Sequence, residues 1–316
     1  MTLAMLVAAL GCATAAAESY PNKPVKIVVP FAPGGNLDVT ARLIAESLAR
    51  QLGQPFIVEN RPGAGGAVGS EVVAKAPPDG YTLVAGTTAT TIVTPLLVPR
   101  PPYQRASFTA VGLMAVTPLV LSVPASSVDA DLKSFLARVK SQPGKVTIGH
   151  SGNGTTNHIA IVLMQDALKL EFAIVPYKGS GPALIDLVGG HIDAIVDQTS
   201  SSLPHIRAGK ARPLAVLSRS RIADLPDVPT LAEQGVKEFE MVTPSGLLAP
   251  AKTPPEVVKT LNTALNKALA DPAIGKKLAE LGSEVRPMTP EQFDRFLRAE
   301  ESRLKALATS GVLKGD

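Results

Sequence analysis

Two turns in this sequence combine glycine with small polar residues, and a third is rich in threonine. Together they can bind an anion without a positively charged side chain. The donors that they offer are main-chain N–H groups near Gly34, Gly35 and 152–155, and hydroxyl groups of Thr87, Thr88, Ser151 and Thr155. Neutral donors of this kind suit a carboxylate that is held by hydrogen bonds.

Residues that could support catalysis or metal binding do not form a recognisable set. His150 and His158 lie on either side of a glycine turn, and the other two histidines are scattered, so clustered metal ligands are missing. The segment Gly149–Asn153 has Asn153 where the hydrolase motif GxSxG needs glycine. We expect no catalytic residue, no metal and no cofactor. A secreted α/β enzyme acting on carboxylates stays open as an alternative, with Ser151, His150 and His158 as its candidate groups.

The first glycine turn connects a predicted strand to a predicted helix. Lys26–Phe31 is a short β-branched and apolar run, and Ala32–Asn36 is too rich in glycine and proline to continue it. From Asp38 onward apolar residues recur at helical spacing, and Asn36 or Asp38 could cap this helix. One helix N-terminus contributes roughly 0.3–2 kcal/mol to anion binding, whereas micromolar affinity needs about 8 kcal/mol. Other loops must therefore contribute.

The same strand–turn–helix unit recurs along the chain. Strands are predicted at 56–59, 81–85, 111–114, 119–123, 146–149, 173–176, 192–196, 213–217 and 245–249. Alternation of strands with helices implies parallel sheets that are covered on both faces. Val29–Phe31 has an echo in Val175–Tyr177, as expected for two Rossmann-like halves. The strands at 119–123 and 245–249 are expected to cross between two domains, and two helices, 255–270 and 290–310, are expected to end the chain.

Composition and the first residues indicate an exported globular protein. Hydrophobic residues make up 45% of the 316 residues, and the net charge of +4 is spread along the chain, which does not suggest a nucleic-acid partner. Residues 1–17 combine an apolar run with small residues that end at Ala17, which is typical of a signal peptide. Cys12 is the sole cysteine and lies in this segment, so the mature protein would contain no disulfide. We expect a soluble periplasmic protein.

Several motifs, taken in their order along the chain, resemble the substrate-binding proteins of tripartite tricarboxylate transporters, also called the Bug family. They are Val29–Asp38, Glu59–Gly66, Pro78–Leu83, Gly152–His158, Val175–Gly179, Leu225–Thr230 and Gly246–Pro250. The resemblance runs from about Tyr20 almost to the C-terminus. It implies a type II periplasmic binding protein, an α/β fold in which two Rossmann-like domains flank a hinged cleft. We expect residues 18–121 and 241–316 to form one domain and residues 122–240 the other.

The resemblance also implies which residues bind the ligand. Members of this family clamp a carboxylate between the loops that correspond to 31–38 and 151–155, and the turn at 87–90 and Asp197 also line the cleft. The candidate ligand-binding residues are therefore Phe31, Gly34, Gly35, Asn36, Asp38, Thr87, Thr88, Ser151, Gly152, Asn153, Thr155, His158 and Asp197. Phe31 would cover the apolar part of the ligand, and Asp197 would accept a hydrogen bond from an ammonium or hydroxyl group. Asn36 and Gln198 depart from the residues common in the family.

The expected function is that of a monomeric receptor for a small organic acid, such as a di- or tricarboxylate, an aromatic acid or an amino acid. The resemblance implies a large and a small membrane subunit as partners, which would import the acid with the energy of an ion gradient. An alternative is an orphan receptor that signals to a membrane kinase. The sequence does not distinguish these ligands or these two partners.

Overall fold

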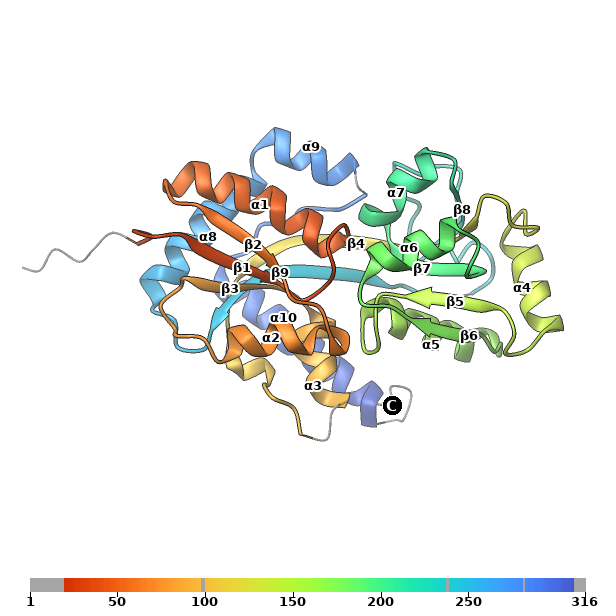
Figure 1. Ribbon diagram of the computed structural model, residues 1–316, viewed down its shortest axis with the longest axis horizontal. Coiled ribbons are helices and arrows are strands. Elements are labelled where there is room, and N and C mark those ends of the chain that lie inside the picture. Colours follow the sequence, from red (N-terminus) through yellow and green to blue (C-terminus); the bar gives the residue numbers. More distant parts are fainter. Residues whose placement is uncertain (1–19, 98–99, 237–238, 281, 310–316) are drawn as a thin grey trace, which may run out of the picture.

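The computed structural model describes residues 20–97, 100–236, 239–280 and 282–309. Figure 1 shows two lobes that lie side by side and are joined by long central strands. The described strands run in the order β2 (Phe56–Asn60), β1 (Val25–Val29), β3 (Thr82–Thr87), β9 (Val242–Pro250), β4 (Phe108–Pro124), β7 (Ala194–Gln198), β5 (Thr147–His150) and β6 (Ala173–Pro176). Strand β8 (Ala211–Val216) pairs with β4 beside this path. Both ends of the described chain lie in the first lobe, and the middle of the chain forms the second lobe.

The first lobe is built on three parallel strands, β1 (Val25–Val29), β2 (Phe56–Asn60) and β3 (Thr82–Thr87). Helices α1 (Asn36–Leu52), α8 (Pro255–Leu269) and α9 (Pro272–Glu280) cover one face of the sheet, and α2 (Ala67–Ala74), α3 (Thr94–Leu97) and α10 (Pro290–Thr309) lie on the other (Figure 1). Side chains of β1 enter both cores: Ile27 packs on the α1 side and Val28 on the opposite side. A strand covered on both faces reads as a continuous apolar run, which is why β1 was recognisable in the sequence.

The second lobe repeats this arrangement with β5 (Thr147–His150), β6 (Ala173–Pro176), β7 (Ala194–Gln198) and β8 (Ala211–Val216). Its helices are α4 (Leu132–Ser141), α5 (Thr156–Leu168), α6 (Ser180–Val188) and α7 (Thr199–Arg207). Strand β5 pairs in parallel with β6 and β7. Phe135, Ile148 and Met164 are buried in its core, whereas α6 packs a separate apolar cluster that includes Leu184 and Leu187.

Two adjacent strands connect the lobes. Strand β4 (Phe108–Pro124) pairs antiparallel with β9 (Val242–Pro250) as far as Pro118. From Leu119 onward β4 pairs with β7 and β8 instead. The chain therefore enters the second lobe along β4 and returns along β9, and the change of partner at Pro118 marks the place where the lobes meet.

The structure corrects several predicted elements. The predicted strands at 111–114 and 119–123 are parts of the single strand β4, and the return strand begins earlier than predicted, at Val242. The prediction of purely parallel sheets is wrong at β9 and β4, whose pairings are antiparallel. Helix α9 was not predicted, and a π-helical turn occupies Ala89–Val93. The predicted signal peptide, residues 1–17, lies outside the described residues.

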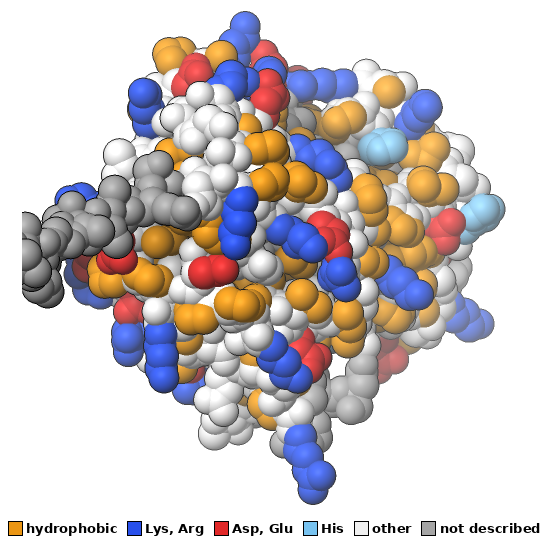
Figure 2. Space-filling view, turned by 60° about the vertical axis from the view of Figure 1, so that its left-hand side comes forward, with side chains coloured by type: hydrophobic (Ala, Val, Ile, Leu, Met, Phe, Trp, Pro, Cys, Tyr) orange, Lys and Arg blue, Asp and Glu red, His pale blue; other side chains and the backbone are white. Residues whose placement is uncertain are grey.

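The surface carries both signs of charge. On the face shown in Figure 2, lysine and arginine side chains are scattered with aspartate and glutamate among them, and apolar side chains lie between these groups. Such mixing lacks the concentrated basic stripe that nucleic-acid-binding surfaces use. No helix in the described part of the chain is both long and apolar enough to span a bilayer.

Candidate functional site

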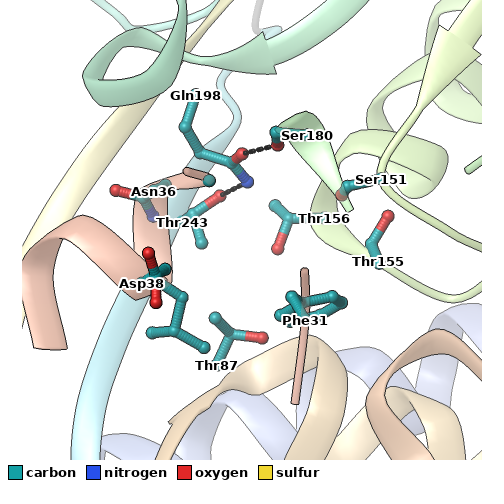
Figure 3. Close-up of a pocket in the computed structure, with 12 residues that line it drawn as sticks. Phe31, Asn36, Asp38, Thr87, Ser151, Thr155, Thr156, Ser180, Gln198 and Thr243 are labelled. Atoms are coloured by element: carbon teal, nitrogen blue, oxygen red, sulfur yellow. Dashed lines mark hydrogen bonds between the residues drawn. The ribbon is translucent and has the colours of Figure 1, made fainter. Parts of the chain in front are cut away.

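A pocket lies between the two lobes, beyond the ends of several strands. Its lining residues are Phe31, Gly35, Asn36, Leu37, Asp38, Thr87, Ser151, Thr155, Thr156, Ser180, Gln198 and Thr243. Figure 3 shows that these residues reach the pocket from both lobes, with Asn36 and Asp38 facing Ser151 and Ser180 across it. The empty space is about 380 Å³ including the opening to solvent.

The lobes touch beside the pocket, so the structure represents a closed arrangement. The main-chain N–H of Ala32 donates to the carbonyl oxygen of Lys178 across the cleft, at 3.2 Å. A Cβ atom added to Gly181 would lie 2.7 Å from the carbonyl oxygen of Pro33. The backbones approach this closely because Gly181 has no side chain.

Four helices begin at the pocket wall. Gly35 is the N-cap of α1, Thr155 that of α5 and Gln198 that of α7, while Ser180 is the first residue of α6. The first N–H groups of a helix have no partner within the helix, and the aligned peptide dipoles give this end a partial positive charge. No lysine or arginine is among the described residues that line the pocket. The electrostatic attraction of this site for an anion therefore comes from main-chain dipoles.

Asp38 holds the first loop in shape and does not present an unused oxygen to the pocket. Its Oδ2 accepts from the Gly34 N–H at 3.0 Å and from Arg42 Nε at 3.1 Å, and its Oδ1 accepts from Asn60 Nδ2 at 2.9 Å. Burial raises the pKa of this carboxyl, but the hydrogen bonds from Arg42 and the main chain outweigh that effect and hold the pKa below the usual aspartate range. The predicted donor Gly34 is thus engaged inside its own loop.

Asn36 is oriented by two hydroxyl groups, one from each lobe. Its Oδ1 accepts from Thr117 Oγ1 at 3.1 Å and from Ser200 Oγ, which belongs to α7 in the second lobe. With its oxygen accepting from both hydroxyls, the amide has its nitrogen turned away from Thr117 and Ser200. The amide nitrogen of Asn36 then lies on the pocket side (Figure 3). Asn36 does not cap α1, contrary to one prediction, since it is the first helical residue and Gly35 precedes it as the cap.

The threonine turn after β3 presents one of its predicted residues to the pocket. Thr87 lines it, whereas Thr88 is buried and lies outside the lining. Thr87 Oγ1 accepts from the Thr90 N–H at 3.2 Å, and the Thr87 N–H donates to Thr90 Oγ1 at 3.0 Å. This reciprocal pair leaves the hydrogen of the Thr87 hydroxyl available for a ligand.

The second loop is held by a helix cap and two histidines. Thr155 Oγ1 accepts from the His158 N–H at 3.3 Å and donates to the Gly152 carbonyl at 2.6 Å. The Nδ1 atoms of His150 and His158 accept from the N–H groups of Gly152 and Gly154, each at 3.1 Å, and the two rings stack with centroids 4.7 Å apart. These Nδ1 atoms therefore cannot serve as a base for a Ser151 nucleophile in this arrangement.

Asp197 lies behind the pocket wall rather than in it. The carboxylate is fully buried and accepts hydrogen bonds from Ser180, Asn157, Ser201 and Ser202. Burial raises the pKa of Asp197, and the hydroxyl donors oppose this rise. The prediction that Asp197 contacts the ligand directly does not fit this arrangement, because both of its oxygens are occupied by side chains of the protein.

Seven of the thirteen predicted site residues line the pocket: Phe31, Gly35, Asn36, Asp38, Thr87, Ser151 and Thr155. The other six, Gly34, Thr88, Gly152, Asn153, His158 and Asp197, lie outside its lining. The sequence reasoning missed Leu37, Thr156, Ser180, Gln198 and Thr243 as lining residues. Ser180 follows the glycine that ends the Val175–Gly179 motif, so its place at a helix start could have been found. Thr243 gave no signal, because the return strand was predicted to begin after it.

Comparison with known proteins identifies the family. Residues 40–311 match the model of the tripartite tricarboxylate transporter family receptor. The chain belongs to this receptor family. Protein BugT of Bordetella pertussis is 36% identical over 314 residues, which cover 96% of each chain, and a protein of Pseudomonas sp. from a tcbD-tcbE intergenic region is 39% identical over 92% of this chain and 87% of its own. The resemblance to the Bug family that the sequence motifs indicated is therefore confirmed.

Solved structures of similar chains have the same fold. A periplasmic transporter structure is 40% identical, with a TM-score of 0.91 and coverage of 94% of this chain and all of that one. MatC of Rhodopseudomonas palustris with bound malate is 35% identical (TM-score 0.87; 91% and 99% covered), and Rpa4515 of the same organism with adipate is 34% identical (TM-score 0.90; 94% and 100% covered). The predicted two-domain periplasmic-binding-protein fold is confirmed.

No group of three or more His, Cys, Asp or Glu side chains that could hold a metal ion occurs among the described residues. The family consists of substrate-binding receptors. The pocket combines helix N-termini, hydroxyls and one oriented amide with the apolar surfaces of Phe31 and Leu37.

Proposed function

We propose that this receptor captures a small carboxylate in the cleft between its lobes and delivers it to the membrane subunits of a tripartite tricarboxylate-type transporter. The observation that carries the proposal is the convergence of the N-termini of α1, α5, α6 and α7 on one pocket whose described lining contains no lysine or arginine. Such a pocket attracts an anion through aligned peptide dipoles and holds it by neutral hydrogen bonds.

Each part of the pocket has a role in this proposal. The carboxylate binds where the start of α1, with Gly35 and Asn36, faces the start of α5, with Ser151 and Thr156. The Asn36 amide and the Ser151 hydroxyl donate to it together with the first N–H groups of both helices. Phe31 and Leu37 cover the apolar part of the acid. The structures of relatives with bound malate and adipate support a small organic acid as the ligand.

The proposal includes the location, partners and division of the chain. Removal of residues 1–17 during export would release a monomeric periplasmic protein that acts without a cofactor or catalysis. The domains would comprise residues 18–121 with 241–316, and residues 122–240. Membership of a transporter receptor family supports membrane subunits as the partners, and the change of pairing at Pro118 supports a hinge close to the first boundary.

The direct test is to identify the bound acid. The exported protein is purified without unfolding, any small molecule it retains is identified by mass spectrometry, and calorimetry then measures binding of di- and tricarboxylates, aromatic acids and amino acids. We expect a dissociation constant in the micromolar range or below for at least one acid, about 8 kcal/mol of binding free energy. Absence of binding by every carboxylate tested would reject the proposed function.

A negative charge placed in the pocket tests where the acid binds, and the same charge placed elsewhere is the matched control. Ser151 is buried and lines the pocket, whereas Ser141 is exposed at the end of α4. We expect Ser151→Asp to weaken binding of the identified acid at least tenfold, because like charges repel in a site of low dielectric constant. Ser141→Asp adds the same charge far from the pocket and should bind like the unmodified protein. Equal affinity of the two variants in calorimetry would show that the acid binds elsewhere.

A further inference from the structure

A chain of hydrogen bonds behind the pocket fixes the direction of the polar groups on one wall. It begins at the Val196 carbonyl and the Asp197 carboxylate, which accept from Asn157 Nδ2 at 3.0 and 3.1 Å. A main-chain carbonyl can only accept a hydrogen bond, so the nitrogen of this amide must face Val196. The oxygen of Asn157 consequently faces the next residue in the chain of bonds, Gln198.

The orientation of Gln198 follows from that of Asn157. Gln198 Nε2 donates to Asn157 Oδ1 at 2.6 Å and to Thr243 Oγ1 at 3.1 Å. Both amide hydrogens are therefore used inside the wall. The oxygen Oε1 accepts two long hydrogen bonds, from Ser180 Oγ at 3.3 Å and from Asn157 Nδ2 at 3.4 Å. Figure 3 shows Gln198 between Ser180 and Thr243, with its amide oxygen on the Ser180 side.

Ser180 has its own hydrogen directed away from the pocket. Its hydroxyl donates to Asp197 Oδ1, and Asp197 also receives donors from Ser201 and Ser202 on its other oxygen. Ser180 Oγ therefore offers lone pairs toward the pocket rather than a hydrogen. Ser180 Oγ and Gln198 Oε1 together form an acceptor pair on the second-lobe wall, and both residues line the pocket.

The pocket thus has two faces of opposite hydrogen-bonding character. The starts of α1 and α5 present donors, including the Asn36 amide, while the acceptor pair is backed by the buried Asp197. Both internal hydrogen bonds to Gln198 Oε1 are longer than usual, so a hydrogen-bond donor of the ligand can bind this oxygen more strongly than they do. A second carboxylate of the ligand directed at Ser180 Oγ and Gln198 Oε1 would place acceptors against acceptors, and Asp197 would repel it.

We propose, as a refinement of the carboxylate-receptor function above, that the pocket selects acids that carry a hydrogen-bond donor besides the carboxylate, an ammonium or a hydroxyl group, and that Ser180 and Gln198 determine this selectivity. The carboxylate lies against α1 and α5, and the donor of the ligand lies against the acceptor pair. Asp197 acts as a positioning residue, because it orients Ser180 directly and Gln198 through Asn157.

Matched series of acids test this selectivity on the unmodified protein. Calorimetry compares propionate with lactate and alanine, succinate with malate and aspartate, and phenylacetate with mandelate and phenylglycine. In the size class that binds, we expect the hydroxy or amino acid to bind at least tenfold more tightly than the unsubstituted acid. Within each series, comparison of the hydroxy acid with the amino acid shows which donor is preferred. Equal or tighter binding of the unsubstituted acid overturns the selectivity, whereas failure of every acid overturns the receptor function itself.

Two serine variants show whether the acceptor pair is responsible. Ser180→Ala removes one acceptor, and we expect the preference for the donor-bearing acid to fall at least fivefold while affinity for the unsubstituted acid is retained. Ser202 also donates to Asp197, at 3.1 Å, but does not line the pocket, so Ser202→Ala is the matched control and should keep the preference. A preference that is unchanged in Ser180→Ala, or lost equally in both variants, contradicts the assignment. The acid series on the unmodified protein decides the matter even if a variant does not fold.

Discussion

Two buried carboxylates, one lining the pocket and one behind its wall, are held by hydrogen bonds from the protein. Each oxygen of Asp38 and of Asp197 accepts hydrogen bonds from the chain. Asp38 orders the first loop, and Asp197 orders the wall formed by α6 and α7. A receptor for an anion gains from this arrangement, because the negative charges are compensated internally while the helix N-termini remain directed at the pocket.

Asp38 gives a prediction for the dependence of stability on pH. Its pKa is lowered in the folded state, since the hydrogen bonds to the carboxylate outweigh burial. Its stabilising contribution is therefore present above the usual aspartate pKa and is lost as the pH falls through the folded-state pKa. We expect Asp38→Asn to lower the free energy of unfolding by about 1–3 kcal/mol at neutral pH, with the difference from the unmodified protein shrinking below about pH 4. Urea denaturation at several pH values measures this.

The exposed Asp227 is the control for that experiment. Asp227→Asn removes the same charge without removing buried hydrogen bonds, so its unfolding free energy should stay within about 0.5 kcal/mol of the unmodified value. A difference for Asp38→Asn that does not change with pH would show that the ionised form is not what stabilises the loop.

Asn36 gives a prediction for affinity. Its oxygen is held by Thr117 and Ser200, so its nitrogen is the atom that can donate to a carboxylate. Asn36→Asp keeps the shape but replaces this donor by a negative oxygen, and we expect affinity for the acid to fall at least tenfold. Asn36→Ser, which restores a hydroxyl donor, should lose less. Calorimetry measures the affinity of both variants for the acid. If the aspartate variant binds as tightly as the serine variant, Asn36 does not contact the carboxylate.

Residue types and motifs predicted one side of the pocket better than the other. Phe31, Gly35, Asn36, Ser151 and Thr155 line it as expected, because each lies in a glycine turn between a strand and a helix. The Gln198 wall could not be predicted in the same way. Its members come together through β7, β9 and α6, and their hydrogen-bond directions depend on a carboxylate that does not line the pocket at all.

At the scale of elements, the start of α5 shows how a loop is held for binding. Thr155 caps the helix, and the Nδ1 atoms of His150 and His158 accept the N–H groups of Gly152 and Gly154. The sequence reasoning proposed His158 as a ligand-binding residue, whereas the structure gives its Nδ1 a main-chain partner in the preceding turn. The ordered loop then sets Ser151 and the first turn of α5 against the cleft.

This arrangement predicts different outcomes for two substitutions at one position. The side-chain oxygen of asparagine can occupy about the place of histidine Nδ1, so His158→Asn should retain the bond to Gly154 and bind the acid within about threefold of the unmodified protein. His158→Leu leaves the N–H without an acceptor, and we expect at least tenfold weaker binding. Calorimetry together with thermal unfolding measures both. Equal losses in the two variants would mean that the ring itself, rather than its acceptor atom, is required.

The continuity of β4 and the presence of α9 were not predicted from the sequence, and each has a physical reason. The predicted strands at 111–114 and 119–123 left a gap that contains Pro118. Strand β4 continues through this gap because its pairing partner changes there, so the lost N–H of Pro118 costs little. Helix α9 is short and contains Gly275, which weakened its pattern. Asp271, whose Oδ1 accepts from the Ala273 N–H at 2.8 Å, is a start signal that could have revealed it.

At the scale of the whole molecule, closure depends on positions where the lobes have no room for a side chain. A Cβ atom at Gly181 would lie 2.7 Å from the Pro33 carbonyl oxygen of the other lobe. We expect Gly181→Ala to weaken acid binding about tenfold, because the closed arrangement must open slightly to accept the methyl group. Small-angle scattering with saturating acid should show a larger radius of gyration than for the unmodified protein.

Gly275 provides the comparison for this experiment, because a Cβ atom there would meet nothing within 4 Å. Gly275→Ala should leave affinity and scattering unchanged and stabilise α9 by about 0.5–1 kcal/mol. If Gly181→Ala closes and binds like Gly275→Ala, the contact between Gly181 and Pro33 does not limit closure.

The path of the chain through β4 and β9 has a consequence for how such receptors can diversify. Because the outgoing and returning strands are direct neighbours, the segment 119–241 is an excursion whose two ends lie side by side. A segment with adjoining ends can be exchanged as one cassette between relatives while the first lobe, with both described ends of the chain, stays intact. Five of the twelve residues that line the pocket, including Ser180 and Gln198, belong to that segment, so an exchange would transfer their chemical preference to another receptor.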